Sequence, residues 1–116
     1  MIDARRVLVV DDETKQLGIL RAILGREGFD VECAATAEAA AAILRDAPPA
    51  VILTDLKLPG MDGIRLLERA LRASPHTVVI IMTAHGTVDT AVQAMKMGAF
   101  DYLTKPLARE DRKSVV

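Results

Sequence analysis

The sequence predicts an α/β domain in which helices cover both faces of a five-stranded parallel sheet. Two observations favour this fold class. Short apolar runs rich in Val, Ile and Leu alternate five times with stretches of helical apolar spacing, and the connections between them are short. The central run, Val51 to Asp55, is almost wholly apolar and lies between two helical patterns, which indicates a strand buried on both faces.

The first two strands are expected on either side of a helix. The strands are predicted at Arg6 to Val10 and at Phe29 to Ala35, and the helix from Thr14 to Glu27, with Gly28 as the C′ residue that ends it. The second strand is more polar than its neighbours, which is typical of a sheet edge. The helix is expected to direct Leu17, Leu20, Ile23 and Leu24 inward.

The middle of the chain supplies two more helices around the central strand. Thr36 is an expected N-cap for a helix from Ala37 to about Asp46, and Pro48-Pro49 ends it. Another helix is expected from about Ile64 to Ala73, and Ser74-Pro75 breaks it. The inward residues of this helix are expected to be Leu66, Leu67 and Leu71.

The alternation continues with a fourth strand at Val78 to Met82 and a short fifth strand at Phe100 to Thr104. Between them, Thr87 can cap a helix from Val88 to Met97, which Gly98 ends. The inner face predicted for this helix consists of Val88, Ala91, Val92 and Met95.

The chain has the length of one domain. We expect that domain to span residues 1–107. Residues 108–116 could begin a fifth helix but are few and show no inward stripe, so this helix is either stunted or cut. An uncovered strip of sheet would favour self-association or partial disorder there.

Composition excludes several classes of function. A net charge of −1 gives no electrostatic reason to expect direct binding to nucleic acid or to a membrane surface. No apolar run approaches the roughly 18 residues of a membrane span, and no room for a signal peptide precedes the first strand. The single Cys33 cannot form an internal disulfide and is expected to be a small buried side chain. These features favour a cytoplasmic location.

Polar groups stand at the ends of four predicted strands: Asp11-Asp12, Asp55, Thr83 and Lys105. Parallel strands bring these groups to one edge of the sheet. Two like charges 4 Å apart cost about 4 kcal/mol at an effective dielectric near 20, and one ammonium cannot neutralise three acids. Carboxylate oxygens suit Mg²⁺, so the sequence predicts a magnesium pocket at this edge.

A carboxylate in such a pocket can attack phosphorus. We expect Asp55 to be the nucleophile, with the metal held by Asp12 and Asp55 and with Asp11 assisting through water. Lys105 is expected to contact a second phosphoryl oxygen, and the hydroxyl of Thr83 or the amide that follows it the third.

Each residue also has a simpler interpretation. Asp11 or Asp12 alone is more often a helix N-cap, and Asp55 before a turn is more often a turn former. Thr83 alone would only satisfy a backbone group, and Lys105 alone is usually a solvated charge. The conjunction of acid, acid, hydroxyl and ammonium on four strand ends favours a site, because capping alone does not explain it.

These residues lie in four segments that resemble the receiver domain of two-component response regulators. The segments are Val9-Val10-Asp11-Asp12-Glu13, Leu53-Thr54-Asp55-Leu56-Lys57-Leu58-Pro59-Gly60-Met61-Asp62-Gly63, Met82-Thr83-Ala84 and Lys105-Pro106. The resemblance implies the flavodoxin-like (CheY-like) strand order 2-1-3-4-5. It also implies that Asp55 accepts phosphate from the phosphohistidine of a sensor histidine kinase, that Mg²⁺ is required, and that Asp12, Asp55 and the Lys57 carbonyl are direct metal ligands.

The resemblance further implies a switch formed by Thr83 and Tyr102. Phosphate on Asp55 would draw the Thr83 hydroxyl inward and leave space that the Tyr102 ring can fill. Lys57 and His85 lie two residues beyond Asp55 and Thr83, and we expect them to border the path of the water that hydrolyses the acyl phosphate. The alternative is that both are ordinary solvated loop residues.

Two segments are similar to the receivers of σ54-dependent (NtrC-like) transcriptional activators: Thr83-Ala84-His85-Gly86-Thr87 and Ala99-Phe100-Asp101-Tyr102-Leu103-Thr104-Lys105-Pro106. In that subgroup an ATPase and a DNA-binding domain follow, so both are expected in the full-length protein, and DNA binding is not assigned to this segment. A homodimer is also among the expected assemblies, although the missing fifth helix removes part of the usual dimer surface.

Three rival functions fit the sequence less well. A haloacid-dehalogenase-type phosphatase needs a second acid two residues beyond its nucleophile, and Lys57 stands there. A flavodoxin-like cofactor binder needs hydroxyl- and glycine-rich phosphate loops and stacking aromatics, and this chain has no Trp. A receiver relic used only for docking would not need the intact pocket. We expect a signalling domain that is not a classical enzyme but catalyses its own phosphorylation and dephosphorylation.

Overall fold

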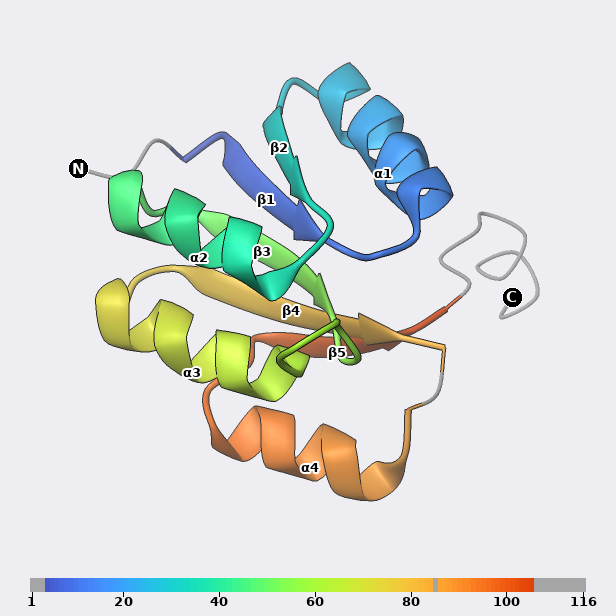
Figure 1. Ribbon diagram of the computed structural model, residues 1–116, viewed down its shortest axis with the longest axis vertical. Coiled ribbons are helices and arrows are strands. Elements are labelled where there is room, and N and C mark those ends of the chain that lie inside the picture. The colour runs from blue at the N-terminus through green and yellow to red at the C-terminus, as the bar shows by residue number, and fades with distance from the viewer. Residues whose placement is uncertain (1–3, 85, 106–116) are drawn as a thin grey trace.

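The computed structural model describes residues 4–84 and 86–105 of the chain, in which five strands alternate with four helices (Figure 1). In chain order the elements are β1 (Arg6–Val10), α1 (Thr14–Arg26), β2 (Asp30–Ala34), α2 (Ala37–Asp46), β3 (Val51–Asp55), α3 (Gly63–Ala73), β4 (Val78–Thr83), α4 (Val88–Lys96) and β5 (Asp101–Thr104). Every predicted element is present, and its bounds differ from the prediction by no more than one residue at either end. The expected α/β class is therefore confirmed.

All neighbouring strands pair in parallel, in the order β2-β1-β3-β4-β5. The strand order implied by the resemblance is confirmed. The polar second strand lies at one edge, as expected, and β5 lies at the other. At the β2 edge, Arg6 forms an ion pair with Glu32 of the neighbouring strand.

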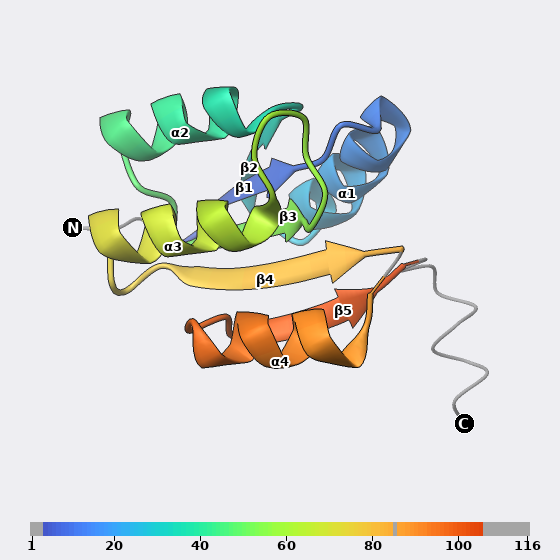
Figure 2. The same ribbon diagram turned by 60° about the horizontal axis from the view of Figure 1, so that its bottom comes forward.

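Helices cover both faces of this sheet. Alternate strand residues on one face pack against α2, α3 and α4, and those on the other face pack against α1. Figure 2 shows the arrangement of these helices about the sheet. The larger core contains Leu8, Ile52 and Ile81 from the strands, all fully buried. Burial on both faces explains why the strands are continuous apolar runs rather than alternating ones.

The inner face predicted for α4 was wrong for its three larger residues, while Ala91 is half-buried. Val88 is 79% exposed, and Val92 and Met95 are each 47% exposed, while Ala94 is fully buried. Helix α4 packs beside the edge strand β5 and approaches the sheet through its small residues, so its larger apolar side chains face outward. Ile23 of α1 is also on the outside, at 48% exposure.

Other inward residues lie as predicted. Leu17 and Leu20 of α1 are buried, and Leu66 and Leu67 of α3 are fully buried. Cys33 is half-buried against the α1-side core rather than enclosed within it.

Local capping explains where three helices begin. The hydroxyl of Thr36 accepts a hydrogen bond from the Ala39 amide at 3.1 Å, and the carboxylate of Asp62 accepts one from the Arg65 amide at 2.9 Å. Thr87 caps α4. The capping residue of α1 is Glu13, whose side chain makes no capping bond, so neither Asp11 nor Asp12 serves as its N-cap.

On the α1 side, the sheet is incompletely covered by the described elements. Leu53, Ile80 and Leu103 on three adjacent strands are only half-buried, and α1 is the one helix on this face within the part of the chain that the structure describes. The expected stunted fifth helix falls on residues 108–116, outside the described residues. None of the described helices combines the length and hydrophobicity that a membrane span requires.

Candidate functional site

Three carboxylates meet where β1 and β3 end. Val10 of β1 pairs with Thr54 of β3, so the next residues, Asp11 and Asp55, leave the two strands side by side. One carboxylate oxygen from each of Asp11, Asp12 and Asp55 lies within 4.8 Å of the others. The parallel register thus brings together acids that are more than forty residues apart in the sequence.

Lys105 lies directly against two of these acids. Its Nζ is 2.7 Å from Asp11 Oδ2 and 3.0 Å from Asp55 Oδ2, and a longer contact of 3.8 Å reaches Glu13 Oε1. The side chain of Lys105 is 9% exposed and that of Asp11 is fully buried. The Lys105 amide also donates to the Thr83 carbonyl at 2.8 Å, which holds the end of β5 against the end of β4.

The surroundings of Lys105 shift the pKa of its ammonium. Burial by itself lowers the pKa of the ammonium, but the hydrogen bonds and charges of Asp11 and Asp55 outweigh burial and raise the pKa above its ordinary value of 10.5. Lys105 is therefore a fixed positive charge at neutral pH, not the solvated lysine of the simpler interpretation.

The carboxylates of Asp11 and Asp55 also accept hydrogen bonds from backbone amides. Asp11 Oδ1 accepts from the Glu13 amide at 3.0 Å, and Asp55 Oδ1 lies 3.3 Å from the Lys57 amide. Asp55 thus makes the turn contact of its simpler interpretation with one oxygen while the other oxygen contacts Lys105. Asp12 is exposed, and Thr83 is buried.

A pocket of about 290 Å³ adjoins these groups and is lined by Asp12, Glu13, Asp55, Lys57, Thr83 and Ala84. Glu13 was not singled out from the sequence, although its place beside the aspartate pair was a signal for it. His85, the second residue expected to influence phosphate lifetime, lies outside the described residues.

The donor set fits a hard divalent cation. Three carboxylates against one ammonium leave two formal negative charges, and the available ligand atoms are oxygens, which Mg²⁺ prefers. The backbone carbonyl of Lys57 belongs to a residue that lines the same pocket.

Gly63 brings the start of α3 against the backbone of the acceptor strand. A β-carbon on Gly63 would clash with the Asp55 carbonyl oxygen and would lie 3.0 Å from Leu56 Cα. The Gly63 amide donates to the Leu56 carbonyl at 2.6 Å. This close approach holds the loop that follows β3 back over the end of the strand.

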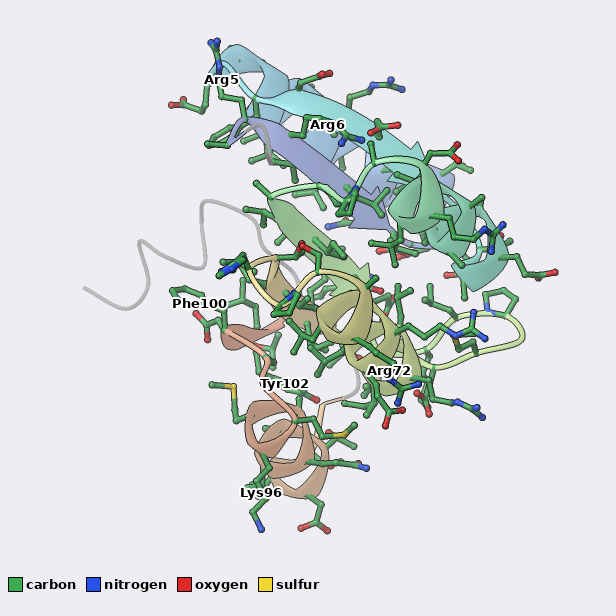
Figure 3. All side chains as sticks on the ribbon, turned by 90° about the vertical axis from the view of Figure 1, so that its left-hand side faces the viewer. Arg5, Arg6, Arg72, Lys96, Phe100 and Tyr102 are labelled. Carbon is green, nitrogen blue, oxygen red and sulfur yellow. The ribbon has the colours of Figure 1, made fainter. Side chains whose placement is uncertain are left out.

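Tyr102 lies on β5 where that strand faces α4 (Figure 3). It is half-buried, and its hydroxyl is 2.7 Å from Thr90 Oγ1 at the start of α4. Thr83 and Tyr102 lie on the adjacent strands β4 and β5. In the register of these strands Thr83 pairs with Thr104, and Tyr102 pairs with Ile81.

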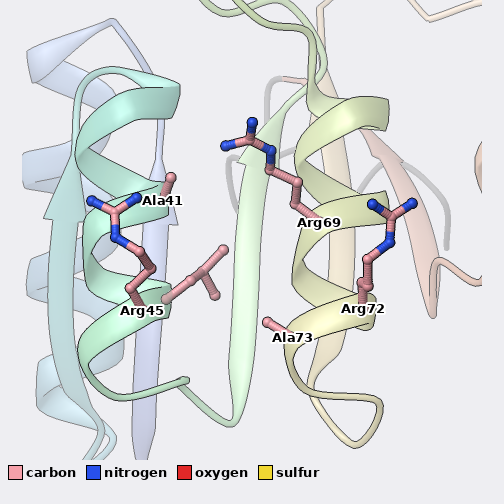
Figure 4. A pocket seen from close by; sticks show the side chains of 6 residues that line it. Ala41, Arg45, Arg69, Arg72 and Ala73 are labelled. Carbon is pink, nitrogen blue, oxygen red and sulfur yellow. The ribbon is translucent and has the colours of Figure 1, made fainter.

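A second pocket, of about 300 Å³, lies between α2 and α3 (Figure 4). Arg45, Arg69 and Arg72 surround an apolar floor that includes Leu44. Arg45 and Arg72 stand in the last turns of their helices, where positive charge complements the exposed carbonyl groups. Because helices run opposite to the strands, this pocket lies toward the other end of the sheet from the carboxylates.

Comparison with known proteins agrees with this geometry. Residues 7–116 match the family described as the response regulator receiver domain. The Escherichia coli regulatory protein AtoC is 37% identical over 116 residues, which are 100% of this chain and 25% of that protein. The Pseudomonas aeruginosa response regulator protein PilR is 40% identical over 103 residues, which are 89% of this chain and 23% of that protein. This chain thus spans about a quarter of the length of these curated relatives.

Solved structures agree in fold. A CheY-like receiver domain from Methanospirillum hungatei superposes with a TM-score of 0.88 at 34% identity, covering 97% of this chain and 90% of that one. The beryllofluoride-activated NtrC4 receiver domain dimer superposes with a TM-score of 0.86 at 40% identity, covering 96% of this chain and 92% of that one.

Proposed function

Because the chain belongs to the response regulator receiver domain family, the phosphoacceptor domain of two-component systems, we propose that Asp55 is the residue that accepts the phosphoryl group. The observation that carries this assignment is the contact between Asp55 Oδ2 and Lys105 Nζ at 3.0 Å, in a pocket with two further acids. Asp55 also stands at the end of β3, the middle strand of the sheet.

Asp55 and the residues around it would have different roles in phosphoryl transfer. Asp55 would attack phosphorus through a carboxylate oxygen and form an acyl phosphate, while the donor keeps the electron pair of the broken bond. Lys105 would bind one phosphoryl oxygen, and the Thr83 hydroxyl or the Ala84 amide another. Such positioning and charge neutralisation supply most of the catalysis in phosphoryl transfer.

We assign the metal site to Asp11, Asp12, Asp55 and the Lys57 carbonyl. A bound Mg²⁺ would supply the positive charge that lets an anionic phosphoryl group approach three carboxylates. Asp12 and Asp55 would bind it directly, and the buried Asp11, already engaged by Lys105 and the Glu13 amide, would act through water.

The partners follow from the family and the relatives. We propose that a sensor histidine kinase donates the phosphoryl group in the cytoplasm, and that ATPase and DNA-binding domains adjoin this segment in the full-length protein. A homodimer is supported by the likeness to the NtrC4 receiver dimer. The domain would also catalyse loss of its own phosphoryl group, with Lys57 and His85 bordering the approach of water.

Output would pass through Thr83 and Tyr102. When the Thr83 hydroxyl turns toward a phosphoryl group on Asp55, the Tyr102 ring would gain the space that the side chain vacates. The result would be a shift in population between two arrangements of α4 and β5. The exposed Val88, Val92 and Met95 on α4 offer a surface on which a partner could read that shift.

Incubation with acetyl phosphate and MgCl₂ tests the assignment of Asp55. Intact-mass measurement is expected to show one added phosphoryl group in the wild type and none in Asp55→Asn. Asp46→Asn, which changes an exposed acid at the end of α2, is the matched control and should be phosphorylated normally. Continuous hydrolysis of donor without a phosphorylated protein would instead support a phosphatase, and modification of Asp55→Asn would refute the assignment.

A further inference from the structure

A side-chain hydrogen bond joins β5 to the first turn of α4. The Tyr102 hydroxyl lies 2.7 Å from Thr90 Oγ1, and both side chains are half-buried. A bond this short between hydroxyls is well within the normal range and is partly shielded from water. It links the one tyrosine of the chain to a residue of α4 that is twelve positions away in the sequence.

Thr90 also belongs to the capping box that begins α4. Its amide donates to Thr87 Oγ1 at 3.1 Å, and its hydroxyl accepts from the Thr87 amide at 3.1 Å. The same hydroxyl lies 3.0 Å from the Thr87 carbonyl, which can only accept.

The hydrogen-bonding capacity of Thr90 allows a bond in which Tyr102 is the donor, although Thr87 Oγ1, 3.0 Å away, is a further possible partner of the Thr90 hydroxyl. A hydroxyl has one proton and two lone pairs. If the Thr90 proton goes to the Thr87 carbonyl and one lone pair accepts from the Thr87 amide, the remaining lone pair can accept the phenolic proton of Tyr102. In this arrangement Tyr102 completes the bonding of Thr90, the residue of the capping box that bonds back to the N-cap Thr87.

Gly86 provides the space for the Tyr102 ring. A β-carbon at position 86 would lie 2.8 Å from the Tyr102 hydroxyl oxygen, 3.0 Å from its Cε1 and 3.1 Å from Thr83 Cγ2. The ring of Tyr102 and the methyl group of Thr83 therefore border the same small space beside Gly86. Movement of Thr83 changes the room that is available to the ring.

We propose that Thr90 is a positioning residue through which the start of α4 responds to the position of the Tyr102 ring. A phosphoryl group on Asp55 draws Thr83 away from the space beside Gly86, the ring occupies its present place more often, and the first turn of α4 is held more tightly. This inference rests on the proposed function, because the movement of Thr83 depends on phosphorylation of Asp55.

Hydrogen exchange of the Thr90 and Ala91 amides tests the proposal on the full chain, with Mg²⁺ and with or without acetyl phosphate. Tyr102→Phe removes only the hydroxyl and is expected to speed exchange of these amides by about two- to tenfold, the range given by one ordinary hydrogen bond. Phosphorylation is expected to slow their exchange in the wild type and not in Tyr102→Phe. Thr90→Ser keeps the hydroxyl and should behave as the wild type.

Gly86→Ala displaces the ring without removing a hydroxyl, so it should reproduce the effect of Tyr102→Phe. Gly25→Ala is its matched control, because a β-carbon there meets no atom within 4 Å. Unchanged exchange at Thr90 and Ala91 in Tyr102→Phe, with intact mass showing normal phosphorylation, would overturn the inference and leave the proposed function standing. Absence of phosphorylation in the wild type would overturn the proposed function, while the comparison of unphosphorylated proteins would still decide whether Tyr102 stabilises α4.

Discussion

The ammonium of Lys105 lies 3.0 Å from the carboxylate of Asp55, fifty positions earlier in the sequence. The contact spans two strand intervals of the sheet, since β4 separates β3 from β5. The Lys105 ammonium also donates to Asp11 Oδ2 at 2.7 Å. Asp11 follows β1, which lies on the opposite side of β3 from β5, so this bond holds the lysine across the end of β3. The three side chains therefore interact as one electrostatic unit.

Lys105→Met should destabilise the metal-free protein. The substitution leaves the fully buried Asp11 without its cation, and loss of one partner from a buried ion pair costs about 3 kcal/mol. The free energy of unfolding in urea, without metal, is expected to fall by about that amount, and saturating Mg²⁺ should restore part of it. Lys96→Met, on exposed α4, is the control and should change stability little. A metal-free variant as stable as the wild type would contradict the prediction.

The pKa of Lys105 also predicts a dependence of stability on pH. The pKa is above 10.5 in the folded protein and ordinary in the unfolded chain, so the folded state holds this proton more tightly. The stability that results is complete below about pH 10.5 and is lost as the pH rises through the folded-state pKa. Urea unfolding at a series of alkaline pH values should show a decrease for the wild type that is smaller for Lys105→Met. Parallel curves for the two proteins would exclude Lys105 as its source.

Asp12→Asn should stabilise the metal-free protein. Removal of one charge relieves repulsion among three carboxylates whose oxygens lie within 4.8 Å, and for an exposed group the gain is at most about 1 kcal/mol. The same change should weaken the increase in melting temperature that Mg²⁺ produces in the wild type. Asp30→Asn, an exposed acid at the β2 edge, should leave the effect of Mg²⁺ intact. If Mg²⁺ raised the melting temperature of Asp12→Asn as much as that of the wild type, Asp12 would not be a ligand of the metal.

Gly63→Ala should be strongly destabilising. The new β-carbon meets the Asp55 carbonyl and the Leu56 backbone, which cannot move as a flexible side chain would. Overpacking of this kind costs about 1–3 kcal/mol, and it should also slow phosphorylation because it displaces the strand end that carries Asp55. Gly18→Ala in α1 meets nothing within 4 Å and should stabilise the helix by about 0.5–1 kcal/mol. Equal stabilities for the two variants would show that the loop has room for a β-carbon.

Substitution of Lys57 and His85 together should change the lifetime of the phosphorylated protein more than its rate of formation. Lys57 lines the pocket that contains Asp55, and its side chain is exposed, so it can affect the entry of water without holding the phosphoryl group. Decay is measured by intact mass after removal of acetyl phosphate from the double alanine variant. The single Lys57→Ala variant separates the contribution of Lys57 to the decay rate from that of His85. Identical decay in wild type and double variant would refute this role.

Most of the architecture was predictable because the signals for it are local. Continuous apolar runs marked the buried strands, and residues such as Thr36 and Gly28 marked helix ends through one capping bond or one positive φ angle. Convergence of Asp11, Asp55 and Lys105 followed from parallel strands sharing one edge.

The failures concern which neighbour a helix meets. Helix α4 has apolar residues on more than one side, and its sequence does not reveal that it packs beside an edge strand through Ala94 and leaves Val92 outside. The same limit applies to Ile23 of α1. The bond between Tyr102 and Thr90 was also missed, since it depends on the exact distance between α4 and β5.

Lys105 follows immediately after the last residue of β5, so the side chain that touches the acceptor belongs to the point where the polypeptide leaves the sheet. The backbone of Lys105 is fixed as well, since its amide donates to the Thr83 carbonyl at 2.8 Å. One lysine thereby links the acceptor to the ends of β5 and β4 by contacts that do not include α4.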